Sequence, residues 1–363
     1  MGSSLTLALT GDVMCGRGID QILAHPCDPV LYEPWVRSAV EYVALAERRN
    51  GPIPRRVDGP YLWGEALDVM GEATVRIINL ETAVTDRGEP WPQKGIHYRM
   101  NPANLYCLTA AGIDCCVLAN NHVLDWSYPG LDDTLENLAG AGIACCGAGR
   151  DHAEATAPAV LDTGEGERVI VVGLGSTSSG IPDAWEAGPA RPGVALTRLS
   201  AGEVERLAAC LGSLKTPDDL VVASVHWGPN WGHRIPASHR RFARALIDEA
   251  GVDVVHGHSS HHPLAIEVHR GRPILYGCGD LINDYEGISG HEEYRPDLGL
   301  VYRVELSDSL LDRLEVVPVR RLRFRLTMAG REDRRWLAAT LTREGTQFGT
   351  TVEEEGGRLV LRW

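Results

Sequence analysis

The sequence predicts an α/β protein whose strands are covered on both faces. One pattern recurs along the chain: an amphipathic helix, a glycine, a short apolar strand and then a polar cluster. The strands are unbroken apolar runs rather than alternating ones, which is typical of strands buried on both faces. Polar residues follow several of these strands, and α/β sheets collect ligands outside the carboxyl ends of their strands.

The elements follow in order from this pattern. We predict strands at residues 5–9, 75–79, 114–118, 169–173 and 220–225, and another after Gly251. The best helix lies before Gly251, which is a plausible stop signal, and Ser238 is a plausible N-cap residue. The same pattern is seen in residues 101–122, where a helix ends near Gly112, and in residues 131–149.

No linker divides the chain, so residues 1–363 are predicted to form a single domain. Two segments look like excursions from the scaffold, at about residues 26–68 and 176–193. The second is rich in Gly, Pro and Ser and could act as a lid. Beyond about residue 300 the sequence alternates in the manner of β structure, which indicates a mostly β C-terminal extension.

Composition excludes some classes of function. The formal charge of −14 leaves no excess of basic residues to neutralise phosphates, so nucleic acid is not an expected partner. No apolar run is long enough to cross a bilayer, and no leader pattern precedes the first strand. The nine cysteines fit no disulfide framework. A cytoplasmic location is therefore expected, and the oligomeric state is left open.

A metal site is indicated by the polar residues that follow the predicted strands. Imidazole and carboxylate together suit divalent transition metals, and one carboxylate can bridge two ions in a hydrolase that activates water. The stretch HGHSSHH alone holds four of the chain's 13 histidines. The candidates at strand ends are Asp12, Glu81, Asn121, His226 and His258.

The order of these motifs resembles a known family. The blocks are Thr10-Gly11-Asp12-Val13-Met14, Asn79-Leu80-Glu81, Ala119-Asn120-Asn121-His122 through Asp125, Val225-His226-Trp227-Gly228 and Gly257-His258-Ser259-Ser260-His261. Together, over about residues 5–285, they resemble the CapA family of capsule-synthesis proteins. That family is linked to poly-γ-glutamate and belongs to the calcineurin-like metallophosphoesterase superfamily.

The resemblance implies a four-layer α/β/β/α sandwich and a centre of two divalent metal ions, Mn, Fe or Zn. It assigns Asp12 to the first ion, Glu81 to the bridging position, and Asn121 and His226 to the second ion. His258 and His261 would supply the remaining imidazoles, and His256 and His262 would lie in packing or supporting positions. His122 would act as general acid or transition-state stabiliser, oriented by Asp125. Without a reactive role, His122 would simply be a histidine at a helix start.

The sequence also departs from the family pattern. The last motif usually reads GHHPH but here has two serines, and Gly279-Asp280-Leu281 replaces the usual Gly-Asn-Phe. Many relatives carry a membrane anchor, which is not seen in this chain. Candidate substrate-binding residues are Arg17, Asn230, Arg234 and Asp280.

The function that follows is a hydrolase acting on a small or oligomeric anionic substrate, at a phosphoester or at a glutamyl or peptide-type amide bond. It would be linked to poly-γ-glutamate or a related biosynthetic pathway. Two alternatives are a non-catalytic accessory protein of polymer assembly and an amide-forming or amide-cleaving enzyme of a small biosynthetic cluster.

Overall fold

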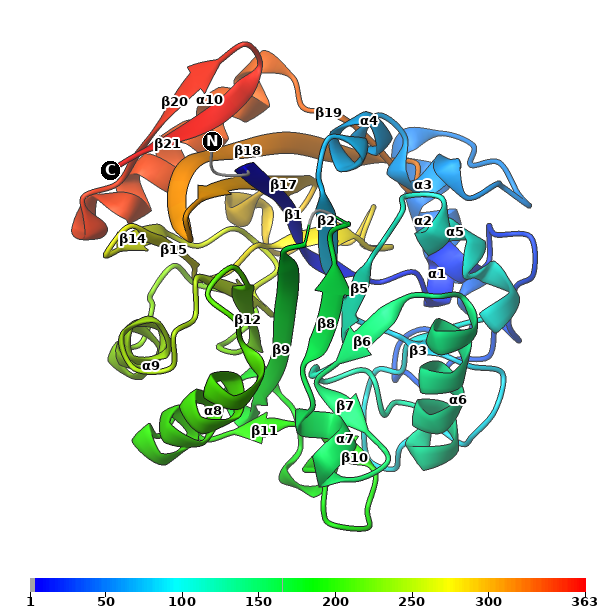
Figure 1. Ribbon diagram of the computed structural model, residues 1–363. Helices are drawn as coiled ribbons and strands as arrows, with labels where there is room; N and C mark the ends of the chain where they lie inside the picture. The colour runs from blue at the N-terminus through cyan, green and yellow to red at the C-terminus, as the bar shows by residue number, and fades with distance from the viewer. Residues whose placement is uncertain (1–3, 165) are drawn as a thin grey trace.

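Two large β-sheets dominate the computed structural model, which describes residues 4–164 and 166–363 (Figure 1). The first sheet has the order β20 (Thr351–Glu355), β21 (Arg358–Arg362), β18 (Leu310–Leu322), β17 (Leu298–Ser307), β1 (Ser4–Val13), β2 (Val75–Leu80), β5 (Cys115–Val117), β6 (Ala144–Cys146), with β16 (Asp280–Ile282) beside β1 and β19 (Arg325–Met328) beside β18. The second has the order β11 (Leu196–Thr197), β9 (Arg168–Ser176), β12 (Leu220–His226), β13 (Val254–His258), β15 (Arg272–Leu275), β14 (Ile266–His269), with β8 (Ala159–Asp162) beside β9. Two short pairs join β3 (Ala83–Val84) to β4 (Arg99–Met100) and β7 (Ala148–Gly149) to β10 (Gly193–Val194).

Helices flank both sheets, with α8 and α9 on one side and α2, α5 and α6 on the other (Figure 1). The α-helices are α1 (Arg17–Asp20), α2 (Val40–Asn50), α3 (Pro60–Trp63), α4 (Ala66–Gly71), α5 (Tyr106–Thr109), α6 (Ser127–Gly140), α7 (His152–Thr156), α8 (Ala201–Leu214), α9 (Ala237–Asp248) and α10 (Arg331–Gly345). Short 3-10 turns are η1 (Pro102–Asn104), η2 (Thr177–Ser179), η3 (Asp183–Trp185), η4 (Glu292–Tyr294) and η5 (Thr346–Phe348). Helix α9 begins at Ala237 with Pro236 as its N-cap, so the expected N-cap at Ser238 is wrong.

The packing of apolar side chains explains this layering. Side chains alternate along a strand, so Leu7 and Leu9 of β1 face one way and Ala8 the other. Leu7 and Leu9 belong to a core that also holds Val171 and Val222 of the second sheet. A second core joins the outer face of the first sheet to helices α1 to α6, and a third joins the second sheet to α8 and α9. The sheets therefore pack face to face with helices outside, and the predicted α/β class is confirmed.

The C-terminal segment is built into the first sheet. Strand β17 pairs antiparallel with β1 from Ser4 to Thr10, so it is a central strand rather than part of an extension. The excursion at about 26–68 contributes α2, α3 and the start of α4, and the one at about 176–193 contributes η2 and η3. Among the described residues, no helix combines the length and apolar character needed to span a bilayer.

A close approach of two strands fixes the end of β1. The amide of Asp12 donates to the carbonyl of Gly279 at 3.0 Å, and Asp12 pairs with Asp280 of β16 and with Asn79 of β2. A Cβ atom at Gly11 would lie 1.6 Å from the carbonyl oxygen of Gly279. Glycine is therefore required at this position, because any side chain would force β1 and β16 apart.

Replacing Gly11 with alanine is expected to lower the free energy of unfolding by about 3 kcal/mol or more, at the upper end of overpacking effects. Denaturant unfolding followed by circular dichroism measures this. The control is Gly212→Ala within α8, where an added Cβ meets no atom within 4 Å and alanine favours the helix. If Gly11→Ala were as stable as Gly212→Ala, the strand approach would not be tight.

Candidate metal centre

Strand ends from both sheets bring the predicted ligands together. Strands β12 and β13 are parallel neighbours, so His226 lies beside His258, with the two Nδ1 atoms 2.7 Å apart. Asp12, at the end of β1 in the other sheet, has its Oδ1 4.0 Å from His258 Nδ1. Asn121, after β5, has its Oδ1 3.1 Å from His226 Nε2. The face-to-face packing of the sheets therefore closes one site from both.

Two groups of side chains could each hold a metal ion, and both contain Asp12. The first is Asp12, His226 and His258, and the second is Asp12, His261 and Asp280. Within each group one ligand atom per residue lies within 4.8 Å of the others. Asp280, which we expected to contact substrate, is thus placed among candidate ligands, with its Oδ1 2.9 Å from His261 Nδ1. Burial alone would lower the pKa of His261, but the carboxylates of Asp280 and Asp12 together raise it.

Unpaired carboxylate oxygens indicate that this site fits a metal. Asp12 Oδ2 and Glu81 Oε2 are buried and receive no hydrogen bond. Burial raises the pKa of Asp12 to about 6, and burial together with the Asp12 carboxyl raises the pKa of Glu81 well above its usual value. Buried acidic oxygens without donors are costly unless a cation meets them. The donor set of carboxylates, imidazoles and an amide oxygen is one that divalent transition metals accept.

Supporting hydrogen bonds hold the candidate ligands in place. Asn79 Nδ2 donates to Asp12 Oδ1 at 2.7 Å, and Asn120 Nδ2 donates to Asn79 Oδ1 at 3.0 Å. Asn120 Oδ1 accepts from the backbone amides of His122 and Val123, both at 3.0 Å, and so shapes the turn that presents Asn121. Such contacts are the usual means by which proteins orient metal ligands.

The two other histidines of the HGHSSHH stretch have different surroundings. His256 Nε2 lies 2.7 Å from the carbonyl of Thr10, and its Nδ1 lies 3.0 Å from Ser224 Oγ. The same hydroxyl lies 2.9 Å from His258 Nε2, so Ser224 connects a buried histidine to a candidate ligand. His262 is buried and packs its ring on Tyr294 with centroids 4.4 Å apart.

His122 is oriented by the residues around it. Its Nδ1 lies 2.6 Å from Asp125 Oδ2 and 3.1 Å from the ammonium of Lys94, and the carboxylate favours the tautomer with the ring proton on Nδ1. Its Nε2 lies 3.8 Å from Glu81 Oε1. The ammonium of Lys94 lies 2.6 Å from Asp125 Oδ1. Burial lowers the pKa of His122 to about 4. At pH 7 the ring is therefore neutral and offers Nε2 as a proton acceptor.

A pocket of about 300 Å³ opens over these residues. Asn230, a predicted substrate-binding residue, lines it, while Arg234 is exposed on the loop after β12 and is absent from the lining. Tyr285 also lines it, as the position of its segment after the last site strand suggested, whereas Lys94 and Tyr98 were missed because they lie in loops without a recognisable pattern. The signal that could have found Lys94 is that the chain has only two lysines. The full lining is Glu81, Lys94, Gly95, Ile96, Tyr98, Asn121, His122, His226, Asn230, Ser259, His261 and Tyr285.

Arg17 requires a correction. We expected it to meet an anionic substrate, but its side chain is buried and its donors are taken by the protein. It donates to Asp284 at 2.8 and 2.5 Å and to Glu33 at 2.8 Å. The guanidinium is therefore committed to an internal network behind the pocket.

Comparison with known proteins adds a family and several relatives. A family model described as "Bacterial capsule synthesis protein PGA_cap" matches residues 6–285. A probable polyglutamine synthesis accessory protein of Mycobacterium tuberculosis (strain CDC 1551) is 48% identical, covering 96% of this chain and 93% of the relative. The PGA biosynthesis protein CapA of Bacillus subtilis is 26% identical, covering 87% and 71%. The capsule biosynthesis protein CapA of Bacillus anthracis is 25% identical, covering 77% and 60%.

Proposed function

This chain belongs to the bacterial capsule synthesis protein PGA_cap family, and from that premise we propose that it is a metal-dependent hydrolase with a dinuclear centre. The family is CapA-like and is linked to poly-glutamate and capsule synthesis. The observation that supports hydrolysis is the placement of two candidate ligand groups, sharing Asp12, beside an oriented histidine in one pocket.

Each side chain has a task in this proposal. Two divalent ions would be held by the side chains of Asp12, His226, His258, His261 and Asp280, with Asn121 and Glu81 beside them. Such ions supply an activated water and charge stabilisation for the reacting group. His122 Nε2 faces the centre and can take or return a proton, while Asp125 keeps the ring oriented. The family resemblance assigned the bridging position to Glu81, whereas in the structure Asp12 is the carboxylate common to both groups, so we propose that Asp12 would serve both ions.

The charges of the pocket limit the substrate that we propose. Among the lining residues Lys94 is the only lysine or arginine, and Asp125 balances its charge. No guanidinium is thus available to grip a carboxylate or a doubly charged phosphate beside the ions. This favours a reacting group of low charge, namely a phosphodiester or a glutamyl or peptide-type amide.

An accessory role without catalysis is the second candidate, favoured by the name of the M. tuberculosis relative. In that case metal would serve only to stabilise the fold or a binding surface. The His122–Asp125 pair distinguishes the two functions, because a scaffold has no use for a histidine held with its free nitrogen toward the centre.

Replacing His122 with asparagine is therefore expected to reduce turnover by about a hundredfold or more while the protein keeps its metal, since general acid–base groups contribute of that order. A generic phosphodiester and a γ-glutamyl amide would be tested as substrates, with metal content measured by elemental analysis. The matched control is His152→Asn on α7, away from the pocket. Equal turnover by His122→Asn and the wild type would remove the catalytic role, and no turnover by the wild type would favour the accessory role.

A further inference from the structure

Two tyrosines meet at the wall of the pocket. The hydroxyl groups of Tyr98 and Tyr285 lie 2.8 Å apart, and both residues line the pocket. The ring of Tyr98 stacks on His122 with centroids 4.0 Å apart, and the ring of Tyr285 meets His261 edge-on at 5.5 Å. The hydroxyl pair therefore lies between the proton-transfer histidine and a candidate metal ligand.

The number of protons on this pair matters. A tyrosine hydroxyl ordinarily carries its proton at pH 7, so each oxygen of the pair brings one proton. Only one of the two protons can lie in the hydrogen bond that joins the oxygens. The other is directed elsewhere, and both residues face the pocket. The pair thus presents one O–H donor, already oriented by its partner, to whatever occupies the pocket.

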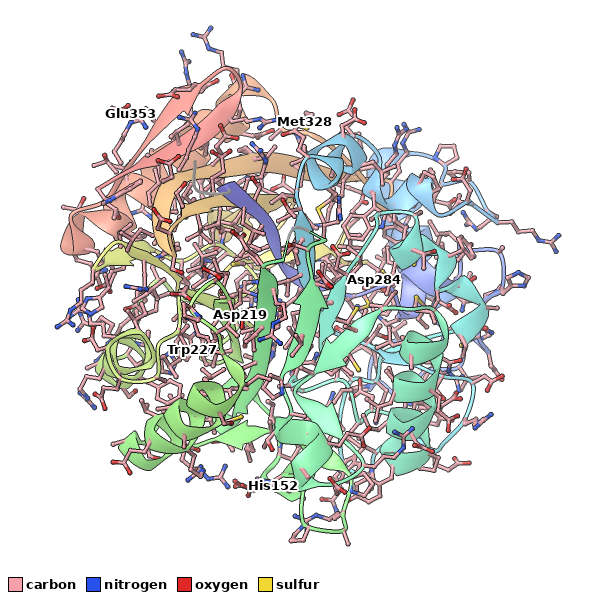
Figure 2. The ribbon with its side chains drawn as sticks, viewed as in Figure 1. His152, Asp219, Trp227, Asp284, Met328 and Glu353 are labelled. Atoms are coloured by element: carbon pink, nitrogen blue, oxygen red, sulfur yellow. The ribbon has the colours of Figure 1, made fainter. Side chains whose placement is uncertain are left out.

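Both rings are held from behind by Arg17. Its guanidinium lies 3.6 Å from the ring centroid of Tyr42, 4.9 Å from that of Tyr98 and 5.8 Å from that of Tyr285. Asp284, next to Tyr285 in sequence, binds Arg17 through both carboxylate oxygens and also accepts from the amide of Gly18, beside α1 (Figure 2). The tyrosine pair therefore packs against the buried Arg17–Asp284 ion pair, which suits a preorganised hydrogen-bond donor.

We propose that the Tyr98–Tyr285 pair donates one hydrogen bond to a non-bridging oxygen of the substrate's reacting group, the oxygen on phosphorus or carbon that gains charge during attack. This deepens the proposed hydrolase function and rests on it. The pair is a neutral donor, so it stabilises developing charge without demanding a charged ground-state substrate, in agreement with the low charge of the pocket.

The test uses the full-length, metal-loaded protein and inorganic phosphate as the probe. Titration calorimetry measures phosphate affinity for Tyr98→Phe, Tyr285→Phe and the double variant. Because one donor serves the ligand, we expect the more affected single variant to bind about tenfold more weakly, and the double variant to be no weaker than that. Elemental analysis should find metal content unchanged. Tyr61→Phe, a half-buried tyrosine whose hydroxyl donates to the carbonyl of Arg323, is the control and should bind as the wild type does.

The outcomes separate this proposal from the proposed function. Weaker phosphate binding in a protein that hydrolyses none of the substrates would support the donor pair and count against the hydrolase. Unchanged phosphate affinity in all three variants would overturn the donor pair and leave hydrolysis standing. Additive losses would overturn the single-donor arrangement, and loss of metal would assign the pair to the metal centre instead.

Discussion

Asp12→Asn is expected to lose both metal ions, falling from about two equivalents to less than one, and to lose about a thousandfold or more of any hydrolytic activity. Asp12 is the one residue common to both ligand groups, so removing its charge weakens both positions at once. Asparagine keeps the shape of the side chain, which limits the effect on β1. Elemental analysis after metal loading, together with turnover of the phosphodiester, measures the two losses.

Variants that remove a ligand from only one of the two groups serve as the comparison for this prediction. His258→Asn and Asp280→Asn belong to one group each and are expected to lose about one equivalent. Asp248→Asn, where the carboxylate pairs with His269 at the surface, should keep both. If Glu81→Gln removed both ions and Asp12→Asn only one, Glu81 would be the bridge, as the sequence predicted.

Acidification from pH 6.5 to 5 is expected to unfold the metal-free protein. Burial lowers the pKa of six buried histidines in the folded state, to about 4 or well below the usual 6.5: His122, His226, His239, His256, His258 and His262. In the unfolded chain these histidines take up protons near pH 6.5, whereas in the folded protein they stay neutral. The free energy of unfolding is therefore fully present above pH 6.5 and decreases as the pH falls. Each such histidine costs about 1.4 kcal/mol per pH unit.

Buried carboxyls with raised pKa values oppose this trend, among them Asp12 and Glu81. The pKa values of Asp12 and Glu81 are raised in the folded state, so their contribution to the free energy of unfolding increases as the pH falls toward 4. The six histidines outnumber them, which leaves a net uptake of protons on unfolding near pH 5.

Urea unfolding with a chelator present, at pH 7.5, 6.5 and 5.5, measures this dependence. His239 provides a clean variant because its ring stacks on Trp227 at 4.8 Å and does not belong to the metal centre (Trp227 is labelled in Figure 2). His239→Phe should reduce the pH slope by about one proton. The exposed His25→Asn should leave it unchanged. A wild-type stability that does not vary over this range would contradict the neutral, buried state of these rings.

The strand-end residues could be predicted because their position depends on local sequence. An unbroken apolar run followed by Asp12, His226 or His258 places that side chain at the carboxyl end of a buried strand, and parallel strands bring these ends to one edge. The role of Asp280 could not be predicted in this way, because it depends on the pairing of β16 with β1. Asp280 lies 268 positions after Asp12 in the chain. Nor could Lys94 and Tyr98 be predicted, because they lie in a loop with no periodicity.

By itself, the sequence determined the α/β class, the order of the strands' polar ends and the histidine and carboxylate types that suit a metal. These depend on periodicity and residue chemistry, which are local. Only the tertiary structure decided which groups meet: that Asp12 belongs to both ligand groups, that Arg17 is used up by Asp284, and that Tyr98 reaches Tyr285. Arg17 shows why, because Asp284, which accepts hydrogen bonds from its guanidinium, lies 267 positions away in the sequence. Contacts at such separations are fixed by how sheets and loops pack, and short-range sequence patterns carry no record of them.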